Sequence, residues 1–203
     1  MRLLSSGSTA LLVELDTLDD VLALYAALAD DPPAGVVDVV PAARTVLLVT
    51  DPGRTTLAAV ADAVRRTTPR PGGRATGDAV ELPVHYDGAD LAELAELLDL
   101  TPEELVQRHT GAEWTVAFCG FSPGFGYLTQ PGADWDVPRR ATPRTKVPPG
   151  SVALAGEFSG VYPRESPGGW QLIGRTDVAV FDLGREPAAL LRPATRVRFV
   201  VAG

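Results

Sequence analysis

The sequence has little of the chemistry on which many protein classes depend. Its single cysteine, Cys119, excludes an intrachain disulfide and leaves no set of thiolate ligands for zinc or an iron–sulfur cluster. Its two histidines, His85 and His109, are too few to predict a transition-metal site. The longest uninterrupted apolar run, residues 21–29, is far too short to cross a bilayer. We therefore expect neither a metal centre nor a membrane-spanning segment.

Positive charge is also scarce. The formal net charge is -8 at pH 7, which argues against nucleic-acid binding, because such binding depends on a basic surface that neutralises phosphates. The start of the chain, Met-Arg-Leu-Leu-Ser-Ser-Gly, is too brief for the apolar region of a secretory signal. We therefore expect a cytoplasmic protein.

The basic residues that are present gather in one part of the chain. Residues 137–176 hold two acids, Glu157 and Glu165, against six bases. The six are Arg139, Arg140, Arg144, Lys146, Arg164 and Arg175. A local basic region on an acidic protein suits a small anion better than a polymer, although arginines that only keep the surface soluble are an equally good interpretation.

The hydrophobic pattern of the first third alternates between extended and helical periods. It predicts a strand, a helix, two strands and a second helix, within residues 8–15, 18–31, 35–51 and 54–67. This order is typical of a small α/β sandwich. Glycine and proline at 69–77 then indicate a linker or exposed loop.

Beyond this loop the pattern changes to one strand, two helices and many short strands. The second helix, 101–111, opens with Thr101, Pro102 and Glu104, which together form a capping box. The strands, separated by Gly and Pro, are expected at 79–86, 113–120, 151–156, 160–163, 169–174, 178–182 and 195–201. We predict an α+β protein with an N-terminal α+β domain at 1–78 and a nearly closed β barrel at 79–203.

One loop, Phe118 to Gly132, is too apolar for a linker and too broken for a strand. Pro123 restricts its own backbone angle φ, while the glycines of the loop allow left-handed backbone conformations. We expect Phe121 and Phe125 to lie in the core, because large apolar side chains are usually buried. Tyr127 is equally suited to the core and to a pocket wall, since its hydroxyl needs a polar partner in either place.

Four segments in order, 118–128, 137–152, 160–163 and 166–176, carry a family resemblance. The chain resembles the KipI or allophanate hydrolase subunit 1 family, which pairs a small N-terminal α/β domain with a cyclophilin-like β barrel. The usual Gln-Thr-Gly before Tyr-Pro is replaced here by Phe158-Ser159-Gly160. If that glutamine contacts the substrate in relatives, the resemblance does not fix the substrate of this chain.

The resemblance implies a function shared between subunits. Members include a subunit of the bacterial ATP-dependent 5-oxoprolinase, which acts with a homologous second barrel subunit of the allophanate hydrolase subunit 2 type and with a LamB/YcsF-like subunit. It implies ATP use by the complex and leaves open whether this chain binds it. Two alternatives stay open: an inhibitor of a sensor histidine kinase, and a urea carboxylase or allophanate hydrolase pathway subunit. The sequence shows no nucleophile or nucleotide motif, so we assign no catalytic residue and expect no activity from the chain alone.

The basic segment supplies the candidate site. Prolines stiffen the backbone around Arg139 and Arg144, which suits a guanidinium held ready for a carboxylate or phosphate. Lys146 is the sole lysine among 18 basic residues, so a compact ammonium is a further candidate. Tyr127, Arg175, Gly168 and Gly169 complete the predicted substrate- or anion-binding set. The alternative for the arginines is an ion pair that braces the loop.

The histidines and the cysteine suit structural roles better. His109 lies near a helix end, where a cation stabilises the dipole, and His85 lies on a strand whose facing the sequence leaves open. Cys119 lies in the middle of a predicted strand and is most simply a small buried apolar residue.

Overall fold

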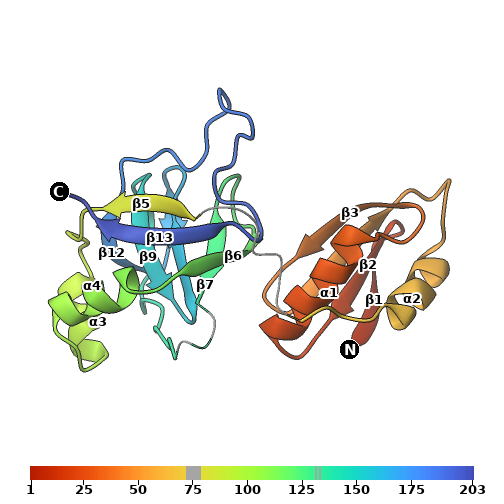
Figure 1. The fold of residues 1–203 in the computed structure, drawn as a ribbon, viewed down its shortest axis with the longest axis horizontal. Coiled ribbons are helices and arrows are strands. Elements are labelled where there is room, and N and C mark those ends of the chain that lie inside the picture. The colour runs from red at the N-terminus through yellow and green to blue at the C-terminus, as the bar shows by residue number, and fades with distance from the viewer. Residues whose placement is uncertain (72–78, 131, 133) are drawn as a thin grey trace. The chain divides into compact units, whose positions relative to one another are not determined.

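The computed structural model describes residues 1–71, 79–130, 132 and 134–203 (Figure 1). The chain divides into two compact units, residues 1–74 and 75–203. The predicted domain boundary at 78 and most of the predicted linker at 69–77 fall on residues 72–78, which lie outside the described residues.

The N-terminal unit is a four-stranded antiparallel sheet with two helices. The strand order is β1-β2-β4-β3. Its elements are β1 (Arg2–Ser6), β2 (Ala10–Glu14), α1 (Leu18–Asp30), β3 (Val36–Pro41), β4 (Thr45–Thr50) and α2 (Leu57–Arg66). The hydroxyls of Thr17 and Thr56 cap the two helices by accepting backbone N–H groups. The predicted order of strands and helices is confirmed, and β1 is an additional strand.

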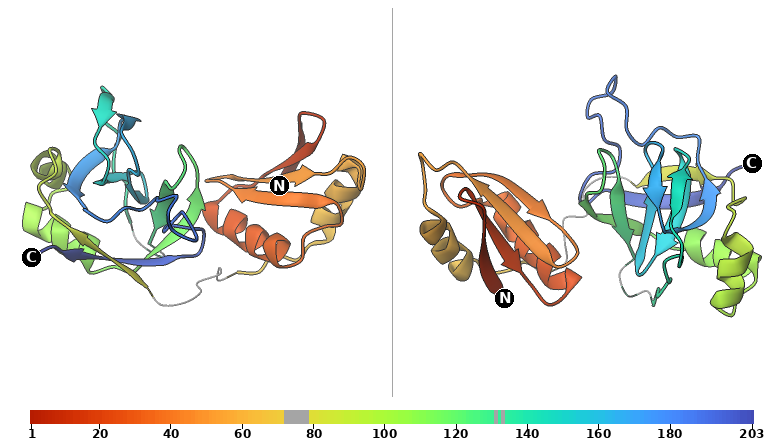
Figure 2. Two further views of the ribbon diagram at one scale, coloured as in Figure 1. Left: turned by 90° about the horizontal axis from the view of Figure 1, so that it is seen from above. Right: turned by 180° about the vertical axis from the view of Figure 1, so that it is seen from behind.

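One apolar layer holds this unit together. Val46 and Leu48 of β4 are buried, whereas their neighbours along the strand are half-buried. The side chains of Val46 and Leu48 pack in one cluster with Leu24 of α1 and Val60 of α2. Both helices therefore cover the same face of the sheet. Figure 2 shows this arrangement from above and from behind.

The C-terminal unit is a seven-stranded, nearly closed barrel with the order β12-β9-β10-β7-β6-β13-β5, plus the two-stranded ribbon β11-β8. Its elements are β5 (Val80–Val84), α3 (Leu91–Leu97), α4 (Pro102–Thr110), β6 (Trp114–Cys119), β7 (Gly126–Thr129), β8 (Arg144–Val147), β9 (Ser151–Ala155), β10 (Phe158–Val161), β11 (Ser166–Gly168), β12 (Gln171–Arg175) and β13 (Arg196–Val201).

The two ends of this sheet meet just beyond β5. The backbone N–H groups of His85 and Arg175 donate to each other's carbonyl oxygens at 2.8 and 2.9 Å. This bridge joins the edge strands β5 and β12, and α3 contacts β12 on the same side of the barrel (Figure 1). The predicted α+β class with a barrel-like sheet is confirmed.

Local signals were reliable where they were strong. The capping box of α4 is present, with Thr101 Oγ1 accepting the Glu104 N–H at 3.2 Å. The predicted strand at 178–182 is wrong, because this segment forms only an isolated bridge between Phe181 and Ala189. Within it Val180 is buried, Phe181 is half-buried against Gly124, and Ala179 is exposed.

His109 lies fully buried in the barrel core. Its ring is hydrogen-bonded to Tyr86 Oη at 2.8 Å and to Ser159 Oγ at 2.9 Å, and it stacks on Phe199 with centroids 4.3 Å apart. Burial lowers the pKa of His109 to about 3, so the ring is neutral at pH 7. The predicted structural role is right, but its predicted cause, a cation at the helix end, is wrong.

Candidate functional site

A cluster of aromatic side chains occupies one side of the barrel. Phe125, Tyr162 and Trp170 are buried in a core of their own, with Tyr127 and Phe158 packed against it. Most rings meet edge to face, as for Phe125 and Tyr162 at 5.2 Å between centroids. Tyr127 stacks on Phe118 at 4.4 Å. Phe158, at the position where the resemblance implies a glutamine, extends this apolar cluster.

The loop before β7 turns one aromatic residue outward. Phe125 is 1% exposed, as predicted, but Phe121 is 56% exposed, so the prediction that it lies in the core is wrong. Its φ of 62° lies in the left-handed region, and the Ser122 N–H donates to the Gly120 carbonyl at 2.6 Å. The Phe121 ring is therefore half exposed at the edge of the aromatic cluster, where it meets Phe125 and Tyr162 edge to face.

A buried carboxylate binds two arginines next to this cluster. Asp90, at the start of α3, is 1% exposed. Its Oδ1 accepts Arg140 Nη1 at 2.5 Å and Arg144 Nη2 at 2.7 Å, while its Oδ2 accepts the Leu172 N–H at 2.7 Å. Burial alone would raise the pKa of Asp90, but the hydrogen bonds from Arg144 and Leu172, with the charges of both arginines, lower it. We call Asp90, Arg140 and Arg144 the arginine clamp.

The arginine clamp carries a net positive charge and spare donors. Arg140 Nε and Arg144 Nη1 are buried and have no hydrogen-bond partner within the described residues. A carboxylate that fixes two guanidiniums reduces the entropy that they lose on binding an anion. The pair is therefore preorganised, while its unused donors leave hydrogen-bonding capacity.

Arg139 is the neighbour of Arg140 in the chain, and its charge acts on two tyrosines of the aromatic cluster. Burial raises the pKa values of Tyr127 and Tyr162, and the positive charge of Arg139 acts against this rise at both phenols. Arg139 is exposed, and it makes no ion pair or hydrogen bond with any residue that the structure describes. Its guanidinium is thus available to a ligand.

A pocket of about 330 Å³ lies beside these arginines. It is lined by Glu93, Leu97, Pro138, Arg139, Arg140, Ala141, Thr142 and Gln171. Helix α3 forms one wall and residues 138–142 form another. The Gln171 Nε2 donates to the Pro138 carbonyl at 3.0 Å and holds the second wall against β12.

Of the other predicted site residues, two glycines lie beside the clamp and two cations lie outside the pocket. Gly168 faces the Tyr162 hydroxyl, and the Gly169 carbonyl accepts the Arg140 N–H at 2.8 Å, so both lie beside the clamp. Lys146 forms an exposed ion pair with Glu165 at 3.2 Å. Arg175 is exposed and pairs with Asp87 at 3.0 Å. Neither of these two cations lines the pocket.

Asp90, Arg140 and Tyr162 were not among the predicted site residues. Tyr162 and Arg140 lie inside segments that carried the family resemblance, and Asp90 lies in a short related segment, 83–91. The burial of Asp90 could not be predicted from the sequence, because its arginine partners are 50 and 54 residues away along the chain.

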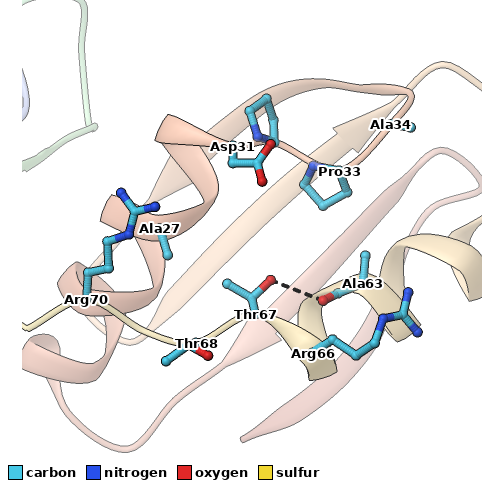
Figure 3. Close-up of a pocket in the computed structure, with 10 residues that line it drawn as sticks. Ala27, Asp31, Pro33, Ala34, Ala63, Arg66, Thr67, Thr68 and Arg70 are labelled. Carbon is cyan, nitrogen blue, oxygen red and sulfur yellow. Dashed lines mark hydrogen bonds between the residues drawn. The ribbon is translucent and has the colours of Figure 1, made fainter.

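A larger pocket, of about 520 Å³, lies in the N-terminal unit. Figure 3 shows Arg66, Thr67 and Arg70 around it, with Thr67 Oγ1 donating to the Ala63 carbonyl at 3.1 Å. Helices α1 and α2 both end there, and helix C-termini repel anions. The arginines offset this local negative field, and Arg70 already pairs with Asp30. This pocket is therefore a weaker anion site than the one in the barrel.

A metal centre, a membrane-spanning helix and a reactive cysteine are three other features that could define a functional site. The described residues contain no group of three or more His, Cys, Asp or Glu side chains placed to hold a metal ion. In the same part of the chain, no helix combines the length and apolar character needed to cross a membrane. Cys119 is half-buried and donates to the Leu191 carbonyl, and burial raises its pKa to about 11, so its thiol is a poor nucleophile at neutral pH.

The fold and the arginine-rich barrel are those of a carboxyltransferase domain. The family model for carboxyltransferase domain, subdomain C and D, matches residues 1–191, and the chain belongs to this family. Three curated proteins, each named as the B-type subunit of 5-oxoprolinase, match at 45–48% identity. The one from Escherichia coli O157:H7 is 48% identical over 124 residues, which is 60% of this chain and 57% of the relative. The resemblance drawn from the four sequence segments is confirmed.

Solved structures agree with this family. The crystal structure of TTHA0988 matches with a TM-score of 0.79 and 37% identity, over 96% of this chain and 40% of that chain. The crystal structure of PH0987 from Pyrococcus horikoshii matches with a TM-score of 0.58 and 30% identity, over 98% of this chain and 97% of that chain. The Kluyveromyces lactis urea carboxylase, at 18% identity and a TM-score of 0.73 over 99% of this chain and 22% of that chain, shows the fold alone.

Proposed function

We propose that this chain is the B-type subunit of an ATP-dependent 5-oxoprolinase complex. The observation that carries the proposal is the 45–48% identity to three curated proteins of that name. The match spans little more than half the length of those relatives. The geometry supports the same function, because the reaction class joins a carboxylate-bearing lactam to a phosphate donor, and both are anions.

In this proposal the chain's residues bind and orient anionic groups. When bound to the complex, ATP would supply the phosphoryl group that activates the lactam carbonyl, and water would then open the ring to give glutamate. Arg139 supplies an unpaired guanidinium, and the arginine clamp supplies two more that Asp90 holds in place. The phenols of Tyr127 and Tyr162 stay protonated because burial raises their pKa values, so they act as hydrogen-bond donors rather than as bases.

The site is completed by other subunits. This chain contributes the arginines, the phenols and Gly168–Gly169, but no nucleophile or nucleotide motif lies in its sequence. Phe121, exposed on a constrained turn, suits contact with a partner, since exposed aromatic side chains are frequent interface anchors. The partners that fit are a homologous barrel subunit of the allophanate hydrolase subunit 2 type and a LamB/YcsF-like subunit, all acting in the cytoplasm.

Turnover by mixtures of purified subunits tests this function. We expect the chain alone to release neither phosphate from ATP nor glutamate from 5-oxoproline. The three-subunit mixture should release both in equal amounts, and omission of this chain should stop both. Urea, offered with bicarbonate and ATP to the same mixture, should give no phosphate release above background. Turnover with urea and none with 5-oxoproline would transfer the chain to the urea pathway, and inhibition of a histidine kinase without turnover would make it a regulator.

A further inference from the structure

Two residues of opposite charge line the same small pocket between α3 and residues 138–142. Arg139 and Glu93 both line it, and neither makes a hydrogen bond or ion pair within the part of the chain that the structure describes. Charged side chains in a binding pocket ordinarily serve a ligand of complementary charge. A ligand that satisfies both must present an anionic group at one end and a donor at the other.

The basic wall is suited to a carboxylate. Arg139 offers a planar fork of donors, which matches the two oxygens of a carboxylate. Beside it, Arg140 is fixed by its 2.5 Å ion pair with Asp90, and the Arg140 backbone N–H donates to the Gly169 carbonyl. The loop that carries Arg139 is therefore anchored at the next residue, so its guanidinium starts from a restricted position.

The opposite wall selects against simple dianions. Glu93 and Leu97 lie four residues apart on α3, and therefore on one face of the helix. The Glu93 carboxylate repels a second negative group and accepts an N–H donor. Leu97 is exposed, and with Pro138 and Ala141 it offers an apolar surface for methylene groups.

The remaining polar groups suit a carbonyl. Thr142 and Gln171 complete the lining, and each has donor capacity in its side chain. A volume of about 330 Å³ lies at the lower end of the range for small-molecule sites, about 300–1,000 Å³. A single five-membered ring that carries a carboxylate, an N–H and a carbonyl has all the groups that these walls complement.

We propose that this pocket binds a small carboxylate that also carries an N–H donor, with the carboxylate on Arg139 and the N–H on Glu93. Cyclic amide acids and α-amino acids belong to this class. The inference rests on the proposed function, because it assigns the lactam acid of that reaction and its amino-acid product to a pocket built from this chain alone. Phosphate binding by the other arginines is a separate matter.

Equilibrium binding to the purified full chain tests the pocket. By calorimetry, 5-oxoproline should bind at least tenfold more tightly than 2-pyrrolidinone, which lacks the carboxylate, and more tightly than glutarate, which lacks the N–H. Arg139→Gln should weaken 5-oxoproline binding about tenfold or more, since a hydrogen-bonded charge pair contributes about 1.5–3 kcal/mol, or a factor of roughly 10 to 150. Arg164→Gln, which removes an exposed charge outside the pocket, should leave binding unchanged.

The role of Glu93 is tested by the preference of the chain for 5-oxoproline over glutarate. Glu93→Gln should weaken 5-oxoproline severalfold and strengthen glutarate, because a repulsive charge becomes a neutral amide. No binding of 5-oxoproline by the wild-type chain, or equal loss in Arg139→Gln and Arg164→Gln, would overturn the pocket. Turnover of the three-subunit mixture is scored separately, so a complex that cleaves 5-oxoproline while this chain fails to bind it would remove the pocket and leave the proposed function standing.

Discussion

Replacing Asp90 with alanine is expected to lower the free energy of unfolding of the barrel unit by about 2–4 kcal/mol. Breaking a buried ion pair by removing one partner costs about 3–5 kcal/mol. The expected value is smaller because the Arg140 and Arg144 side chains are 29% and 23% exposed and are partly screened by water. The Leu172 N–H also loses its acceptor. Urea denaturation followed by tryptophan fluorescence measures the change.

A surface ion pair provides the matched control for Asp90. Glu165 pairs with Lys146 in an exposed position, so Glu165→Ala should cost about 0–1 kcal/mol. Asp90→Asn, which keeps an acceptor for Leu172, should fall between the two. If Asp90→Ala were as stable as Glu165→Ala, the clamp would contribute nothing to the fold, and Arg144 would lose its bracing role.

Acidification is expected to weaken the fold through His109 by up to about 4 kcal/mol. The unfolded chain binds a proton at this residue near pH 6.5, whereas burial lowers the pKa in the folded protein to about 3. The neutral ring therefore contributes its full stability above about pH 6.5, and this contribution is lost as the pH falls towards 3. Protonation would also disrupt the hydrogen bonds of His109 with Tyr86 and Ser159.

The comparison with His109→Gln isolates this effect from the titration of carboxylates. The difference in unfolding free energy between wild type and variant should change with pH from 6.5 to 3.5. A difference that is constant with pH would contradict the account. If the variant does not fold, the nitrogen chemical shifts of the wild-type ring decide the matter, since they should report a neutral imidazole at pH 5.

Local sequence signals were enough for most of the fold. Helix α4 could be placed because Thr101, Pro102 and Glu104 specify its start within a few residues, and its capping box forms as expected. Strands β7, β8 and β11 were missed, since they have four residues or fewer, which is too short for an alternating pattern to stand out. The apolar residues at 178–182 resemble a strand, but only Val180 is buried, and Phe181 packs on the loop at Gly124 instead of pairing in the sheet.

The site was only half predictable for a related reason. Arg139 and Arg144 stand out because prolines stiffen their segment and acids are rare around them. Asp90 gives no such signal, since its arginine partners meet it only after the barrel closes. Phe121 shows the opposite error: a rule based on apolarity predicts burial, but a left-handed backbone conformation turns the side chain outward.

Steady-state kinetics of the assembled complex with Arg139→Gln tests the central claim, that Arg139 and the arginine clamp of this chain bind the anionic groups of the reaction. Because Arg139 has no partner in the described part of the fold, the change should leave the melting temperature and the assembly unchanged. It should lower kcat/KM for 5-oxoproline by about thirtyfold or more, as expected when a charge-assisted contact of about 2 kcal/mol or more is lost. Arg164→Gln should have normal kinetics. A stable Arg139→Gln complex with wild-type kcat/KM would contradict the claim.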